Sequence, residues 1–191
     1  NSANSSNLEK FWSQENLHTI MTQNLVDKTS FLQLRPKYSN DGKRKVFQKF
    51  FGTKTMEEVL KPVFVTAYDV ELRKPILLKS YEHPETLIVE AANATSAAPI
   101  YFPTASMRNN SWLIDGGIAA NNPALLAYVE AKKLFKGEQI KVFAIGTGLN
   151  RRKIDGKRSK DWGAIGWLKN DILGIMVESS LQNEVLKDLI N

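Results

Sequence analysis

The chain of 191 residues contains no cysteine, which excludes disulfide bonds, thiol catalysis and cysteine-ligated metal within it. It has only two histidines, His18 and His83, and neither lies in a sequence context typical of a catalytic histidine. No apolar run approaches the ~20 residues that a membrane-spanning helix needs. With 42% hydrophobic and 24% charged residues, the composition is that of a globular protein large enough to bury a core.

The 20 acidic residues are outnumbered by 26 lysines and arginines, and the resulting net charge of +6 is unevenly distributed along the sequence. Basic residues cluster in residues 43–45, 132–136 and 151–160. Near an anionic membrane each such cation contributes ~1 kcal/mol of attraction, but solvated loops explain the same clusters. The middle cluster also suits the last turn of a helix. No nucleic-acid-binding motif accompanies the charge, so no nucleic-acid partner is expected.

The apolar pattern predicts strands alternating with helices, which is typical of a three-layer α/β fold. Residues 62–69 form a nearly continuous apolar run, as expected for a strand buried on both faces of a parallel sheet. Residues 1–10 are expected to be a mobile polar segment and residues 11–191 to belong to one domain. Further strands are expected at 75–80, 112–114 and 140–145, and helices within 11–26, 43–51, 56–60, 84–93, 123–135 and 162–190.

The most informative stretch is Asp115-Gly116-Gly117, which directly follows a short apolar run. Two glycines let the backbone turn sharply, and Asn122 and Pro123 then mark the start of a helix. A carboxylate where a buried strand gives way to a helix lies at the sheet edge where α/β proteins bind ligands. Asp115 is therefore a candidate catalytic base; the alternative is that it only caps the turn.

This motif resembles the Asp-Gly-Gly segment of the patatin-like phospholipases. Residues 94–103 are similar to that family's Thr-Ser-Ala-Ala-Pro loop, and residues 60–69 and 140–148 resemble two of its strands. The agreement in order and spacing extends over about residues 55–190, and three ordered motifs are far more specific than one. The resemblance implies a patatin-like fold with a mostly parallel central sheet. It also implies a serine–aspartate dyad in which Asp115 takes the serine's proton.

The serine of that dyad is missing, because the chain contains no Gly-x-Ser-x-Gly nucleophile elbow. We therefore expect the chain to be the C-terminal part of a longer catalytic domain, with the serine on an upstream segment. By itself the chain is expected to be inactive. The alternative is a family member that has lost its nucleophile. Ser96 is a poor substitute, since it lacks flanking glycines and follows no strand.

The implied function is that of a lipid acyl hydrolase, cutting phospholipid or glycerolipid esters as a phospholipase A does, without metal or organic cofactor. A peripheral membrane surface is an expected partner, and the protein is expected to be soluble or peripheral, in a bacterial cytoplasm or secreted. The rival function is an inactive lipid- or protein-binding module with the same fold. A third interpretation, nucleotide binding at residues 146–148, is weaker than a simple turn there. The expected site residues are Asp115, the turn glycines Gly116 and Gly117, and a cleft lining of Thr95, Ser96, Ala97, Ala98 and Pro99.

Overall fold

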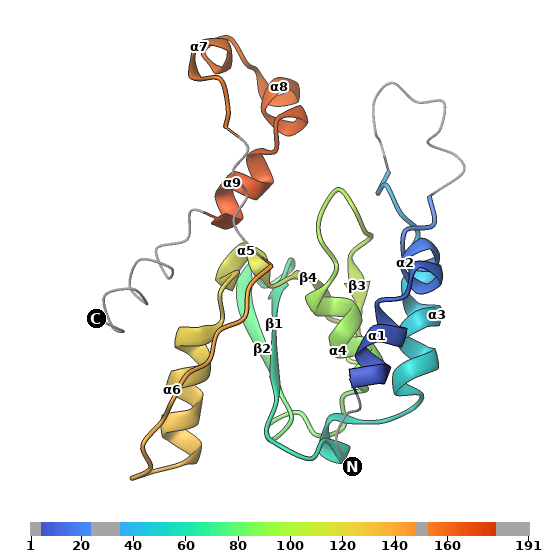
Figure 1. Cartoon of the computed structure of the whole chain (residues 1–191), viewed down its shortest axis with the longest axis vertical. Coiled ribbons are helices and arrows are strands. Elements are labelled where there is room, and N and C mark those ends of the chain that lie inside the picture. Colours follow the sequence, from blue (N-terminus) through green and yellow to red (C-terminus); the bar gives the residue numbers. More distant parts are fainter. Residues whose placement is uncertain (1–4, 24–34, 148–152, 179–191) are drawn as a thin grey trace. The chain divides into compact units, whose positions relative to one another are not determined.

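The computed structural model describes residues 5–23, 35–147 and 153–178 (Figure 1). The chain divides into two compact units, Asn1–Ala119 and Ala120–Asn191. The first unit contains a sheet with helices. The second is helical, apart from irregular segments, among the residues described.

The sheet of the first unit has the strand order β2-β1-β4-β3, and every pairing is antiparallel. The expectation of a mostly parallel sheet is therefore not met among the described residues. A continuous apolar run reports burial, not strand direction, and the short link from β1 to β2 permits only an antiparallel pair. The strands are β1 (Phe64–Asp69), β2 (Lys74–Lys79), β3 (Ala105–Ser106) and β4 (Trp112–Asp115).

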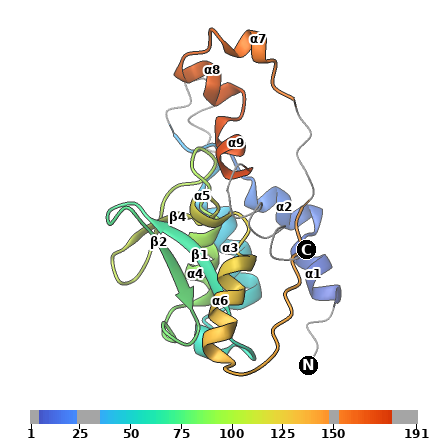
Figure 2. The same ribbon diagram turned by 90° about the vertical axis from the view of Figure 1, so that its left-hand side faces the viewer.

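Strands β1 and β2 pair as a hairpin (Figure 2). Their register runs from Phe64 opposite Lys79 to Asp69 opposite Lys74. Its turn is held by Asp69, whose Oδ1 accepts hydrogen bonds from the backbone N–H groups of Glu71 at 3.0 Å and Leu72 at 2.8 Å. An aspartate that bonds the backbone ahead of it favours such turns. Asp69 is buried and ends its strand, as Asp115 ends β4.

Helix α4 (Ile88–Thr95) packs against strands β1, β3 and β4 of the sheet, and α3 (Asn40–Phe51) packs against α4 in turn (Figure 1). Helix α4 begins four residues later than expected because the chain before it forms a turn, in which the Thr86 N–H bonds the His83 carbonyl. The expected short helix after Thr55 is the 3₁₀ turn η2 (Met56–Glu58), whose Glu58 carboxylate accepts the Thr55 N–H at 2.7 Å. Small and apolar side chains fill the core between α4 and the sheet: Met56, Ala67, Leu78, Ala91, Ala94, Ala97, Ala105, Met107 and Leu113.

Helices α1 (Ser5–Phe11) and α2 (Gln14–Ile20) precede α3 in the sequence. Helix α1 lies mostly within the segment that the sequence suggested was a mobile polar one. An aromatic cluster explains its order, because the ring of Phe11 stacks on Phe47 of α3 at 6.0 Å and meets Phe50 edge-on at 5.1 Å. Such contacts across distant residues are not visible in local composition.

The second unit begins at the end of α5 (Gly117–Ala120). Asn122 and Pro123 mark the start of α6 as expected, one residue further on, since Pro123 is the N-cap and the Asn122 side chain accepts the Ala124 N–H at 3.1 Å. The helices after α5 are α6 (Ala124–Leu134), α7 (Gly156–Ser159), α8 (Ala164–Lys169) and α9 (Ile172–Glu178).

The strand expected over residues 140–145 is not formed: this segment is irregular, and Phe143 and Ile145 are 87% and 84% exposed. A strand needs a neighbour to satisfy its backbone groups, and no strand among the described residues pairs with this segment. The closing helices are present as α8 and α9, and the rest of that prediction, residues 179–190, lies outside the described residues.

Candidate functional site

Asp115 is the last residue of β4, opposite Ala67 of β1. Its backbone N–H donates to the Ala97 carbonyl oxygen at 3.1 Å, which ties the strand end to the segment after α4. Its side chain is partly buried, and Oδ1 accepts the Gly117 N–H at 2.7 Å. One carboxylate oxygen is thus engaged in the turn that begins α5.

Gly116 is buried where the chain leaves β4, and it is there because the backbone of β1 lies close by. A Cβ atom at this position would come within 2.3 Å of the Thr66 carbonyl carbon and side-chain oxygen. No side chain fits in that space without moving the strand. A glycine at position 116 therefore allows the turn after β4 to lie directly against β1.

The pKa of Asp115 is raised above its ordinary value, mainly because burial disfavours the charged carboxylate. The hydrogen bond from the Gly117 N–H and the positive charge of Lys43 act in the opposite direction. A raised pKa makes a carboxylate a better proton acceptor near neutral pH. The same hydrogen bond also fits a turn-capping role.

The segment Thr95, Ser96, Ala97, Ala98 and Pro99 runs from the end of α4 toward an exposed Ile100. Ala97 is fully buried, and the Ala98 carbonyl accepts the Phe102 N–H at 2.9 Å. Ile100 has a φ of 72°, a strained conformation for a β-branched residue. The Ser96 hydroxyl donates to the Ala92 carbonyl of α4 at 2.6 Å. It therefore bonds its own helix.

Lys43 of α3 is a residue that sequence reasoning missed, because we placed it in a basic cluster of solvated or membrane-facing character. It is 1% exposed, and its Nζ donates to the carbonyl oxygens of Ser96 at 3.0 Å and Asn93 at 3.3 Å. Its ammonium also lies 4.3 Å from the ring centre of Phe102. The signal was present in the sequence, since Lys43 stands three and four residues before Val46 and Phe47, on the apolar face of α3.

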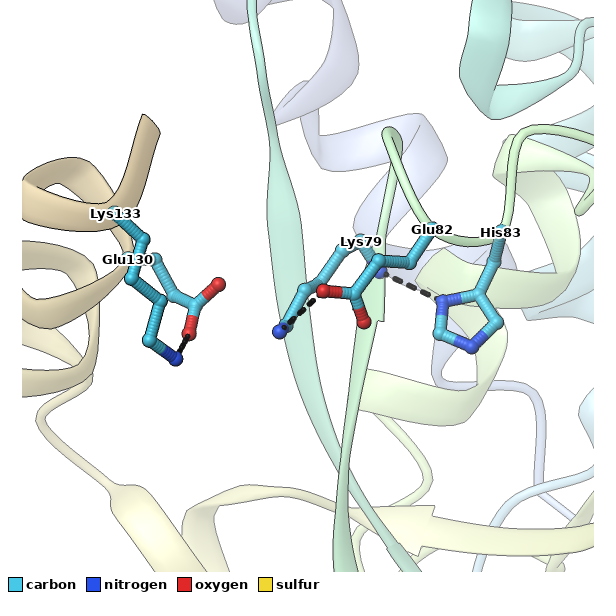
Figure 3. Close-up of polar contacts among 5 residues, drawn as sticks. All are labelled: Lys79, Glu82, His83, Glu130 and Lys133. Atoms are coloured by element: carbon cyan, nitrogen blue, oxygen red, sulfur yellow. Dashed lines mark hydrogen bonds and ion pairs between the residues drawn. The ribbon is translucent and has the colours of Figure 1, made fainter. Parts of the chain in front are cut away.

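The polar contacts around His83 belong to the turn that follows β2. The imidazole Nδ1 of His83 accepts the backbone N–H of Lys79 at 3.3 Å, and the Lys79 ammonium pairs with Glu82 at 2.8 Å (Figure 3). In the second unit, Glu130 and Lys133 of α6 form an ion pair at 2.6 Å. His83 thus helps to hold a turn.

The part of the chain that the structure describes contains a cavity, but no cluster of metal-ligating side chains and no membrane-spanning helix. No group of three histidine or acidic side chains there could hold a metal ion. No helix in the same residues has the length and apolar character needed to cross a bilayer. A cavity of about 320 Å³ is lined by Glu85, Thr86, Glu90, Met107, Arg108 and Asn109. It contains none of the expected site residues, and the Arg108 side chain in it is already paired with Glu90 at 3.2 Å.

The sequence of the chain is similar to that of several known proteins. The family model described as patatin-like phospholipase matches residues 2–128. "Patatin-like protein 1" of Arabidopsis thaliana is 29% identical over 188 residues, covering 82% of this chain and 45% of the relative. The "cGAMP-activated phospholipase" of Pseudomonas aeruginosa is 31% identical over 144 residues, covering 70% of this chain and 43% of the relative. A third relative, "Probable inactive patatin-3-Kuras 1" of Solanum tuberosum, is 23% identical, with 75% of this chain and 46% of the relative covered. The chain thus spans less than half the length of these relatives.

Proposed function

The chain belongs to the patatin-like phospholipase family, and we propose that it supplies the aspartate of a lipid acyl hydrolase whose serine lies on a segment outside these 191 residues. The observation that carries the proposal is Asp115: a partly buried carboxylate of raised pKa at a strand end, with Gly116 packed closely against β1 and the Gly117 N–H bonded to Oδ1. Both units are taken to be parts of one catalytic domain. The substrate class is ester-linked fatty acids of phospholipids or related glycerolipids, at a peripheral membrane surface.

In the proposed reaction the serine oxygen forms a bond to the ester carbonyl carbon while its proton passes to the carboxylate of Asp115. The leaving alcohol then takes that proton as its bond to the acyl carbon breaks. Water repeats the sequence on the acyl-enzyme, with Asp115 again accepting and returning a proton. Backbone amides of the upstream segment would stabilise the oxyanion, at about 3 kcal/mol for each donor. No step requires a metal or organic cofactor.

The segment from Thr95 to Pro99 is proposed to line the cleft. Its small side chains allow close packing, and the hydrogen bond from the Asp115 N–H to the Ala97 carbonyl ties it to the end of β4. Gly116 and Gly117 are proposed to hold the turn. Ser96 is not proposed as the nucleophile, because its hydroxyl already donates to the Ala92 carbonyl.

Labelling with a fluorophosphonate probe, which reacts with activated serines, tests the proposal. We expect the longer protein to be labelled and the 191-residue chain alone to be neither labelled nor active on a lipid ester. Asp115→Ala in the longer protein should abolish labelling, since the serine loses its base, while Ser96→Ala should leave labelling unchanged. Labelling or turnover by the chain alone would contradict the proposal.

A second candidate function is an inactive lipid- or protein-binding module that keeps the fold. It is favoured by one observation, the similarity to a relative whose name describes it as probably inactive. The same experiment separates the two functions. A longer protein that folds, binds lipid and takes up no probe would support the binding module.

A further inference from the structure

Lys43 is a buried cation for which neither the family match nor the reaction scheme assigns a role. Burying a charged ammonium is costly unless it is paired and hydrogen-bonded. Lys43 is 1% exposed, yet its two hydrogen bonds go to backbone carbonyls, those of Asn93 and Ser96, rather than to a carboxylate. Simple stabilisation of α3 would be achieved better by an apolar side chain of similar size. Packing alone therefore does not explain why a charged side chain occupies this position.

Through these two carbonyl oxygens Lys43 is bonded to the C-terminal end of α4. They lie at the last turn of α4 and directly after it, where helix carbonyls lack helical partners and a cation is favoured. The Phe102 ring, 4.3 Å from Nζ, covers the ammonium from the far end of the same loop. One side chain of α3 thus contacts the start of the segment proposed to line the cleft, at Ser96, and also Phe102, three residues beyond the end of that segment.

The same segment is bonded to Asp115 at the neighbouring residue. The Ser96 carbonyl accepts from Lys43, and the next carbonyl, that of Ala97, accepts the backbone N–H of Asp115 at 3.1 Å. The link from α3 to the end of β4 therefore runs through two consecutive peptide groups. Removing the first contact would loosen the support of the second.

Charge supplies a second, independent connection. The positive charge of Lys43 favours the carboxylate form of Asp115, and Asp115 favours the ammonium form of Lys43. Burial lowers the pKa of Lys43 to about 8, and Asp115 is the charged group of the described residues that opposes this effect. The groups that face the ammonium from α4 and the loop are uncharged, namely the two carbonyls and the Phe102 ring.

We propose that Lys43 is the positioning residue of this site: it fixes the loop of residues 96–102 against the end of β4 and places its positive charge where it acts on the carboxylate of Asp115. The role of Asp115 as base rests on the function proposed above, whereas the coupling of the two side chains does not. In this proposal Lys43 acts through Asp115 and the loop.

The test is a ¹³C NMR titration of the Asp115 carboxyl in the longer protein, with Asp115→Asn identifying its resonance. In Lys43→Met, which keeps length but removes the charge, the pKa of Asp115 should rise above its wild-type value. Lys45→Met, which removes an exposed cation from the same helix, is the matched control and should leave it unchanged. An unchanged titration in Lys43→Met, or an equal rise in both variants, would overturn the proposal.

A reciprocal measurement covers the case in which Lys43→Met does not fold. The ¹⁵N shift of the Lys43 ammonium should titrate near pH 8 in the wild type and at lower pH in Asp115→Asn, since coupling between two sites is mutual. Titration at the same pH in both proteins would contradict the coupling.

Activity then separates this proposal from the proposed function. If Asp115 is the base, the acidic limb of the pH profile of kcat/KM moves to higher pH in Lys43→Met and not in Lys45→Met. Coupled titrations in a protein whose hydrolysis survives Asp115→Asn would leave the positioning role of Lys43 intact and refute the catalytic role of Asp115.

Discussion

Single residues decide the geometry at the end of β4. Asp115 and Asp69 both end a strand of the same sheet and both accept backbone N–H groups through Oδ1. They differ in one neighbour: the positive charge of the buried Lys43 acts on the carboxylate of Asp115. The pair therefore offers an internal comparison between a carboxylate that only holds a turn and one proposed to accept a proton.

Gly116→Ala is expected to destabilise the protein by about 1–3 kcal/mol, because the added methyl group overpacks against the Thr66 backbone. Urea unfolding of the variant and wild type measures this difference. Gly146→Ala is the control, since a Cβ there meets nothing within 4 Å and the glycine has no positive φ. Equal stability of Gly116→Ala and wild type would mean that β1 does not approach the turn as closely as described.

The sequence predicted the residues of this turn but not their partner. A short-range pattern can be recognised in a single sequence, and this turn has three: Asp115, the two glycines and the helix start at Pro123. Lys43 lies 72 positions before Asp115. Its burial depends on which face of α3 packs against α4. Neighbouring basic residues made Lys43 look like part of an exposed cluster. Spacing from Val46 and Phe47 was the available clue.

At the scale of elements, α3 joins the start of the chain to the site. Its Phe47 side chain is 7% exposed and stacks on Phe11 of α1, while its Lys43 holds the end of α4. Strands β1 and β2, the turn η2 and helix α3 were predicted because each leaves a local pattern of residues in the sequence. Strand direction and the segment 140–145 were not, since both depend on which neighbour a strand finds.

Phe47→Ala is expected to cost about 3–5 kcal/mol, the usual effect of removing a buried aromatic ring. Because the ring also anchors Phe11, amide exchange in α1 should accelerate more than amide exchange in the β1–β2 hairpin. Gln48→Ala, on the exposed face of the same helix, should change neither quantity by a comparable amount. Uniform acceleration in α1 and the hairpin would indicate that α1 is not held by this cluster.

At the scale of the whole molecule, the chain covers less than half of the relatives that it matches. The family match shows what kind of protein this is, and the strand order adds that the described sheet is antiparallel. Neither shows a serine beside Asp115. The carboxylate of Asp115 is proposed to have a chemical role distinct from its structural one.

Ester hydrolysis by the longer protein carrying either Asp115→Asn or Asp69→Asn, measured together with the midpoint of thermal unfolding, tests that role most directly. We predict that Asp115→Asn lowers the rate by about 10²–10⁴-fold with nearly unchanged stability, as expected for loss of a general base. Asp69→Asn should retain the rate. Retained hydrolysis in Asp115→Asn, or a large loss of its stability as the cause of lost activity, would contradict the account.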